Sequence, residues 1–285
     1  MKKILVIGST GLLGKPTTRQ FIELGHDVSL LARNPEKTRQ LFPECRIEMG
    51  DVFDEDSLRS AFQGKDVVYL NLSVAPSSSN KDPQQEREGM RNIVAAAKKE
   101  KVGRIAYLSS LIKNYQGMNG FDWWAFRIKN AAIDQLKNSG VPYSIFYPST
   151  FMETFLNLIK GNNIYLVSGS HAPMWMIAAA DYGKQVSKAF EIANGNQEFV
   201  IQGLEPFTWD EAAKVIVENY KARQLKIKKA PIGIVKFLGT FNRKVEYGAK
   251  ILTALNNYPE KFESDPAWSA LGKPTITLKA FASAL

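Results

Sequence analysis

The sequence is poor in the residues that form disulfides and bind transition metals. Its 285 residues include one cysteine, Cys45, and two histidines, His26 and His171. A single cysteine excludes an intrachain disulfide and suits a reducing compartment. The histidines lie far apart, and neither has Cys, Asp or Glu at the spacing of a metal site. We therefore expect no metal centre.

Long apolar runs are also missing. No stretch approaches the roughly 20 apolar residues that a membrane-spanning helix requires. The apolar run at residues 4–7 is too short for a signal peptide, and Gly8 ends it. Because 45% of the residues are nonetheless hydrophobic, the chain can bury a substantial core. We expect a soluble, cytoplasmic protein.

Acidic residues are the minority among the charges. The chain has 37 Lys and Arg against 28 Asp and Glu, a formal net charge of +9. Such a balance suggests nucleic acid, an anionic membrane surface or a phosphate-bearing ligand as a partner. No nucleic-acid-binding module is recognisable, so we do not expect nucleic acid.

The basic excess is greatest in residues 221–261, where apolar residues recur near helical spacing. These apolar positions are Ile234, Val235, Leu238, Phe241, Val245, Leu252 and Leu255. The pattern fits a basic amphipathic helix on an anionic membrane or against a protein partner. It also fits a lobe helix whose apolar face covers the core and whose basic face is solvated, and we favour this interpretation.

Strand and helix signals alternate through the first half of the chain. Short apolar runs predict strands at residues 3–8, 27–33, 66–74, 104–111 and 141–149. Amphipathic segments between them predict helices at 15–26, 54–65, 86–101 and 130–140. This alternation predicts an α/β fold, a Rossmann-type doubly wound parallel sheet.

The alternation weakens after residue 150. Strand candidates remain at 163–168 and 198–203, a helix at 207–223 begins with a capping box of Thr208 and Glu211, and a basic helical stretch covers 231–258. We therefore divide the chain into a Rossmann-type domain, 1–150, and a smaller mixed C-terminal lobe, 151–285, in which we expect a substrate or partner to bind. Some segments of this lobe can return to the sheet.

Three glycines lie between the first predicted strand and the first predicted helix. Gly8, Gly11 and Gly14 are spaced three apart in GSTGLLG. A helix N-terminus offers unpaired N–H groups and partial positive charge, and glycines let a phosphate approach the backbone. The segment therefore predicts a pyrophosphate site.

GSTGLLG resembles the corresponding loop of the short-chain dehydrogenase/reductase superfamily, in its extended and atypical branches. Further similarity lies in MGDVFD, in YLSS at 107–110, in Lys129 and in YPSTFMETF at 147–155. IQGLEPFTWDEAA and LGKPTITLKAFA resemble the NmrA-like atypical group. The resemblance implies a nicotinamide dinucleotide held by Gly8, Ser9, Thr10, Gly11, Leu12, Leu13, Gly14, Asp51, Val52, Asn71, Leu72, Ser73, Lys129, Tyr147, Pro148, Ser149 and Thr150. For Asp51, an alternative role is to cap the helix that follows.

The second predicted strand ends at Arg33, where an NAD site usually has an acidic residue. A guanidinium suits the 2′-phosphate of NADP, and Lys37 lies one helical turn further along. We expect NADP(H), with NAD(H) as the alternative.

The resemblance implies a tyrosine four residues before Lys129, but Ala125 stands there, and a methyl group transfers no proton. Ser109 and Ser110 match the family's substrate-binding serine. Three interpretations remain open: Lys129 is itself the acid or base, Tyr115 replaces the missing tyrosine, or the chain is a non-catalytic NADP(H)-sensing regulator with a protein partner. A membrane-surface assembly factor that binds the nucleotide structurally is a further alternative.

Aromatic and sulfur-containing side chains gather in the segments expected near the nicotinamide. We predict a substrate pocket lined by Trp123, Trp124, Phe151, Met152 and Phe155. Such a pocket suits a small apolar or aromatic carbonyl, quinone or enone. The favoured function is hydride transfer between NADP(H) and that substrate. The same side chains also suit ordinary packing in the core of the lobe.

Overall fold

The computed structural model describes residues 1–167, 171–193 and 195–285. Its main sheet has seven strands in the order β10-β6-β5-β4-β1-β2-β3, and every pair in it is parallel. The strands are β1 (Lys3–Ile7), β2 (Asp27–Ala32), β3 (Arg46–Met49), β4 (Val67–Leu70), β5 (Arg104–Leu108), β6 (Tyr143–Pro148) and β10 (Gln197–Ile201). The order reverses direction between β1 and β4, which confirms the doubly wound Rossmann-type fold.

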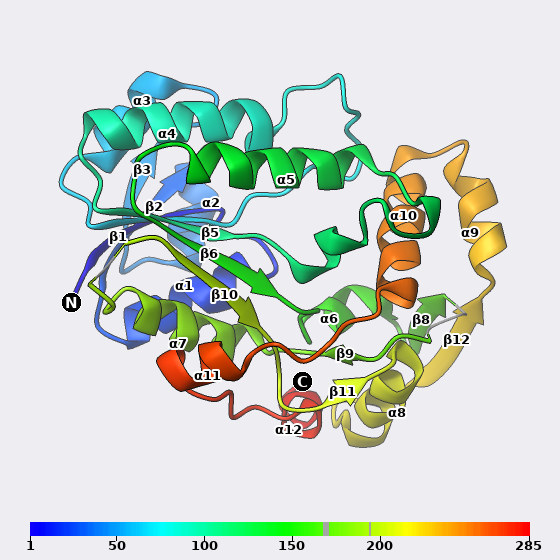
Figure 1. Ribbon diagram of the computed structural model, residues 1–285. Helices are drawn as coiled ribbons and strands as arrows, with labels where there is room; N and C mark the ends of the chain where they lie inside the picture. The colour runs from blue at the N-terminus through cyan, green and yellow to red at the C-terminus, as the bar shows by residue number, and fades with distance from the viewer. Residues whose placement is uncertain (168–170, 194) are drawn as a thin grey trace.

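Helices cover both faces of this sheet (Figure 1). One face carries α3 (Glu55–Phe62), α4 (Met90–Lys99) and α5 (Trp124–Lys137), and the other carries α1 (Gly14–Glu23), α7 (Ala179–Ala189) and α11 (Asp265–Leu271). α2 (Pro35–Leu41) lies beside α1, because Arg19 donates a hydrogen bond to the Leu41 carbonyl at 3.1 Å. Two hydrophobic cores result, one on each face.

The first strand shows why the apolar run at the start of the chain is unbroken. Leu5 and Ile7 belong to the core under α3, α4 and α5, whereas Ile4 and Val6 belong to the core under α1 and α7. Side chains alternate between the two faces of a strand. A parallel strand that is covered on both faces therefore needs apolar residues at successive positions.

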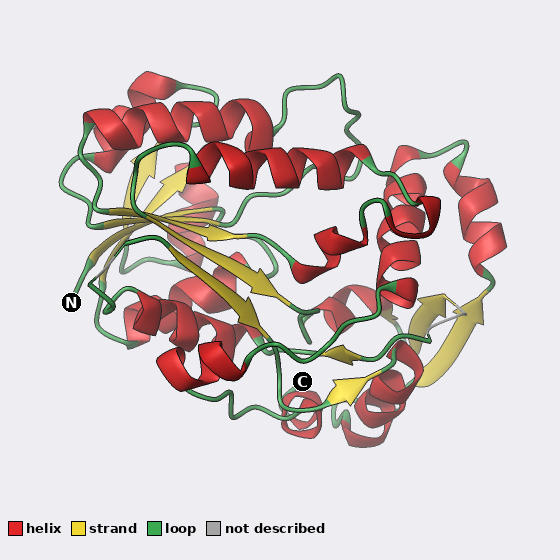
Figure 2. Ribbon diagram, viewed as in Figure 1, coloured by secondary structure: helices red, strands yellow, loops and turns green. Residues whose placement is uncertain are grey.

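Residues after 150 supply both a separate lobe and the far edge of the main sheet. β10, α7 and α11 lie on the sheet, while two small sheets form the lobe (Figure 2). These sheets contain β7 (Ile159–Lys160), β8 (Asn163–Val167) and β12 (Lys226–Ala230), and β9 (Met174–Trp175) with β11 (Pro206–Phe207). The lobe helices are α6 (Thr154–Leu158), α8 (Trp209–Asn219), α9 (Ile232–Gly239), α10 (Arg243–Asn257) and α12 (Leu278–Ser283). Residue 168, in the predicted strand 163–168, lies outside the described residues.

The capping box at the start of α8 is confirmed. The Glu211 amide donates to the Thr208 hydroxyl at 3.3 Å, and the Thr208 amide donates to the Glu211 carboxylate at 2.9 Å. The basic stretch 231–258, by contrast, forms two helices, α9 and α10. Asn242 interrupts it because its side-chain oxygen accepts from the amides of Lys244 and Val245 and so starts a new helix.

A helix that crosses a membrane must be both long and apolar, and the sequence predicts no such helix. Within the described parts of the chain, every helix is too short or too polar to cross a bilayer.

Candidate functional site

The first cavity lies at the carboxyl ends of β1, β2 and β3 and has a volume of about 390 Å³. We call it the glycine-loop cavity. It brings together Gly8, Ser9 and Thr10 after β1, Arg33 and Lys37 after β2, and Asp51 and Val52 after β3. In doubly wound sheets, ligands bind at this edge, where the strand order reverses.

Steric contacts explain two of the three loop glycines. Gly8 has φ +87°, and a Cβ on it would lie 2.3 Å from the Asn71 carbonyl oxygen. A Cβ on Gly14 would lie 2.0 Å from the Gly8 carbonyl oxygen. Gly11 has only ordinary contacts there, at 3.6 Å. The protein's own packing therefore requires glycine at positions 8 and 14, and leaves position 11 for another explanation.

The N-terminus of α1 has unpaired backbone amides. Among the described residues, no side chain caps α1, and its first turn holds no acidic residue. Gly11, Leu12 and Gly14 do not line the glycine-loop cavity, and Leu13 lines the second cavity instead. The open amides and the absent Cβ atoms fit a dinucleotide pyrophosphate.

Positive charge is available at the end of β2. Arg33 and Lys37 are exposed, and in the described residues neither forms an ion pair with a carboxylate. Asp51 accepts a hydrogen bond from the Phe53 amide at 3.0 Å. The cap of α3 is Asp54, which accepts from Asp56 and Ser57, so the alternative that Asp51 caps this helix is wrong.

A second cavity of about 540 Å³ lies beyond the ends of β4, β5 and β6. We call it the central cavity. It gathers many predicted site residues: Leu13, Asn71, Leu72, Ser73, Ser109, Ser110, Trp123, Lys129, Pro148, Ser149, Thr150 and Phe151. The Asn71 side-chain amide donates to the Gly8 carbonyl at 3.4 Å, so one contact joins the walls of the two cavities.

Four of the residues predicted near the nicotinamide or the substrate do not line the central cavity. Met152 and Phe155 are buried in the core of the lobe, where Phe155 meets Trp209 with ring centroids 5.3 Å apart. Trp124 begins α5 and packs beside the cavity-lining Trp123. Tyr147 and Pro148 project to opposite sides of β6, and Pro148 is the one that lines the central cavity. On the other side, the Tyr147 hydroxyl donates to Glu198 at 2.7 Å.

Tyr115, the alternative to the missing tyrosine, does not line the central cavity either. Tyr115 is buried at the end of η2 (Leu111–Tyr115), with its ring 5.0 Å from that of Phe121. It lines a third hollow beside α10, not the cavity that contains Lys129.

A buried carboxylate holds the Lys129 ammonium. Glu86 is 1% exposed and lies in η1 (Gln85–Gly89), a π-helical turn that precedes α4. Its Oε1 accepts hydrogen bonds from Lys129 Nζ and from the Tyr107 hydroxyl, which are 3.5 Å from each other. Burial and the Glu86 charge hold the pKa of Tyr107 well above its usual range. The single-turn π-helix is itself a frequent mark of functional sites.

Several hydroxyl groups line the central cavity together with Ala125, the residue that stands in place of the expected tyrosine. Ser109 and Ser110 line the cavity with Ala125, and the buried Ser109 hydroxyl has no hydrogen-bond partner among the described residues. Tyr247 of α10 adds a phenol, whose pKa is raised by burial and then by Glu86. Sequence reasoning did not select Glu86 or Tyr247, because neither lies in a local motif.

A second buried acid, Glu260, also lines the central cavity. It accepts from the Ser149 hydroxyl at 2.9 Å, from Gln202 Nε2 at 2.7 Å and from the Trp175 amide at 3.2 Å. Burial raises the pKa of Glu260. These bonds orient Ser149, which the resemblance assigns to the cofactor.

Comparisons with known proteins agree with this geometry. A family model described as NAD(P)H-binding matches residues 8–189. The photosystem II assembly factor Ycf39 of Synechocystis sp. is 23% identical over 248 residues, which cover 85% of this chain and 74% of that protein.

Solved structures share the fold over nearly the whole chain. The NADPH-dependent quinone oxidoreductase QOR2 of Escherichia coli, complexed with NADPH, has a TM-score of 0.73 at 19% identity and covers 99% of both chains. The triphenylmethane reductase of Citrobacter sp., complexed with NADP(H), has a TM-score of 0.76 at 18% identity, and the match covers 99% of this chain and 100% of that chain.

Proposed function

The chain belongs to the NAD(P)H-binding family, and from that premise we propose that it is an NADP-dependent oxidoreductase that reduces an apolar or aromatic carbonyl, quinone or enone. One observation carries the proposal. An ammonium anchored by a buried carboxylate, Lys129 on Glu86, lines a cavity whose wall joins that of the glycine-loop cavity.

The dinucleotide would lie across the two cavities. The α1 amides and the glycine loop suit its pyrophosphate, and Arg33 with Lys37 suits the 2′-phosphate of NADP. The names of the two structural neighbours, both complexed with NADP(H), support this choice of cofactor. When bound, the nicotinamide would supply a hydride to the substrate.

The residues of the chain would supply position and a proton. The Ser109 hydroxyl, which has no partner in the described residues, suits a hydrogen bond to the substrate oxygen. The Lys129 ammonium would deliver the proton that this oxygen takes up, while the Glu86 carboxylate keeps Nζ in place. The Tyr247 phenol is the second proton source that the cavity offers.

The cavity wall defines the class of substrate. Trp123, Phe151, Ile251, Leu252 and Leu255 supply an apolar and aromatic lining. Among the described residues, Lys129 is the one lysine or arginine that lines the cavity, and it is already paired with Glu86, so the lining does not favour an anionic substrate. Quinone reduction and dye reduction, named for the two structural neighbours, belong to the chemistry that such a cavity suits.

The test is to mix the protein with NADPH or NADH and a panel of quinones, enones and aldehydes, and to follow the absorbance of the reduced nicotinamide. We expect turnover with NADPH and an aromatic acceptor. Ala125, in place of the family's tyrosine, favours a second candidate function, a non-catalytic NADP(H) sensor with a protein partner. Tight NADPH binding by calorimetry without turnover on the panel would favour the sensor over the enzyme.

A further inference from the structure

The helix α9 carries its large apolar side chains on the outside of the protein. Ile234, Phe237, Leu238 and Phe241 are 55%, 64%, 52% and 79% exposed. Their spacing is i, i+3, i+4 and i+7, which is the spacing of a helix face that is normally buried. Ile234, Phe237 and Leu238 belong to α9, and Phe241 lies in the turn directly after it. The rings of Phe237 and Phe241 lie 5.6 Å apart, so they form one continuous surface. We call these four residues the α9 apolar stripe.

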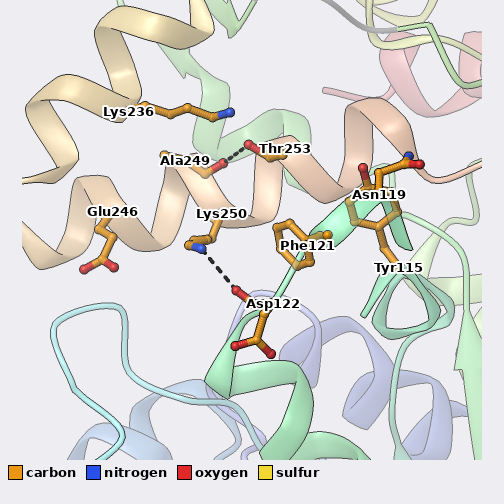
Figure 3. A pocket seen from close by; sticks show the side chains of 10 residues that line it. Tyr115, Asn119, Phe121, Asp122, Lys236, Glu246, Ala249, Lys250 and Thr253 are labelled. Atoms are coloured by element: carbon orange, nitrogen blue, oxygen red, sulfur yellow. Dashed lines mark hydrogen bonds between the residues drawn. The ribbon is translucent and has the colours of Figure 1, made fainter. Parts of the chain in front are cut away.

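The inner side of α9 contacts α10 and leaves the stripe free. A hollow of about 620 Å³ is lined by residues of α10 and by the loop that contains Phe121 and Asp122 (Figure 3). Lys236 is the α9 residue that lines this hollow. At 100° per residue, Lys236 lies nearly opposite the stripe, and no stripe residue lines the hollow. The stripe therefore faces away from the folded chain.

The charges around the stripe have one sign. From residue 221 to residue 245 the sequence has eight Lys and Arg and no Asp or Glu. Lys229 forms an ion pair with Asp210 at 2.7 Å. Lys226, Lys228, Arg243 and Lys244 are exposed and have no ion pair among the described residues. The chain segments directly before and after α9 thus carry exposed cations next to the exposed apolar side chains of the stripe.

The exposed apolar side chains and the cations together indicate which kind of partner binds this surface. An apolar protein partner would cover the four stripe residues but would leave the cations without counter-charge. An anionic lipid surface satisfies both, because acyl chains accept the rings and headgroup phosphates accept the lysines. We propose that the α9 apolar stripe and its surrounding cations dock the protein on an anionic membrane surface. This inference is independent of the proposed oxidoreductase activity.

The experiment is flotation of the full-length protein with vesicles of phosphatidylcholine alone and with vesicles that also contain phosphatidylglycerol. We expect binding to the anionic vesicles, with a decrease as salt is raised. The double variant Phe237→Ser/Phe241→Ser should bind about tenfold or more weakly. Leu24→Ser is the matched control, because Leu24 is 49% exposed at the C-cap of α1. The helices α1 and α9 lie on opposite sides of the molecule (Figure 1).

Further measurements keep the outcome unambiguous. Thermal unfolding and NADPH binding should be unchanged in both variants, because the stripe contacts neither the core nor the two cavities. Wild-type protein that stays unbound to anionic vesicles at low salt overturns the proposal. Self-association in the absence of lipid that is lost in the double variant also overturns the proposal. It would show that the stripe binds a second copy of the chain. Equal binding of the double variant and the Leu24→Ser control overturns it as well.

Discussion

The glycine-loop cavity is built almost entirely from residues 7–52, whereas the central cavity draws its wall from residues 13–260. In the first, three consecutive strand ends bring their side chains to one sheet edge. In the second, α5, η1 and α10 must come together before the wall exists. Local motifs therefore specify the first cavity, and long-range packing specifies the second.

The largest effect should come from separating the buried pair in the central cavity. Lys129→Met leaves the Glu86 carboxylate buried without its cation. We expect the free energy of unfolding to fall by about 3–5 kcal/mol and turnover to fall at least about 100-fold. Urea denaturation and steady-state kinetics measure the two losses.

Two matched variants sharpen this result. Lys129→Met/Glu86→Gln should regain most of the stability but no turnover, because an amide remains a hydrogen-bond acceptor for Tyr107. Tyr247→Phe keeps the ring that contacts Trp123 and should keep turnover within about threefold. Full turnover in Lys129→Met with loss in Tyr247→Phe would reassign the proton to Tyr247.

The next effect tests the glycine-loop cavity. Gly14→Ala places a Cβ 2.0 Å from the Gly8 carbonyl oxygen, and should cost about 1–3 kcal/mol of stability. Gly11→Ala meets only ordinary contacts, so it should keep the wild-type melting temperature while NADPH affinity falls at least about tenfold. Unchanged NADPH affinity in Gly11→Ala would show that no phosphate approaches this backbone.

Arg33→Ala should weaken NADPH binding by about 10- to 100-fold, the range for one charge-assisted contact. NADH binding should change little, because NADH lacks the 2′-phosphate. Calorimetry with both dinucleotides measures the difference. Arg39→Ala, on the adjacent helix α2 and paired with Glu36 outside the cavity, is the control. Equal losses for NADPH and NADH would falsify the phosphate contact.

The smallest effect concerns Glu260 in the central cavity. Burial raises its folded-state pKa above the unfolded value, so the folded state binds more protons. The contribution of Glu260 to stability is therefore greatest below the unfolded pKa and is lost as pH rises through the folded pKa. Glu260→Gln removes this loss and keeps the contacts to Ser149 and Gln202. Urea midpoints from pH 4 to 8 should fall less steeply in the variant; parallel curves would contradict the raised pKa.

Much of the fold follows from local patterns. Unbroken apolar runs such as β1, alternating with amphipathic helices, predict the parallel sheet, and Thr208 with Glu211 predicts the start of α8. Position 14 needs glycine for a contact with its near neighbour Gly8. Such features need only residues a few positions apart, so the sequence displays them directly.

The basic stretch at 231–258 shows where local patterns stop being sufficient. The expectation that its apolar residues face the core holds for Leu255 of α10, which is buried in the core of the lobe. It is wrong for α9, whose stripe has the same periodicity but is exposed. Periodicity defines an apolar face, and only the arrangement of neighbouring elements decides whether that face is covered.

The sequence by itself determined the sheet, the glycine loop and the cation at the end of β2, because each depends on residues that are adjacent in the chain or share one helix face. Only the tertiary structure decided that Glu86 meets Lys129, that Tyr247 and Glu260 enter the central cavity, and that Met152 and Phe155 stay out of it. The contact of Glu86 with Lys129 joins residues 43 positions apart, and that of Ser149 with Glu260 joins residues 111 positions apart. No local preference specifies such a pairing, because it depends on how the sheet, η1 and the C-terminal lobe pack together.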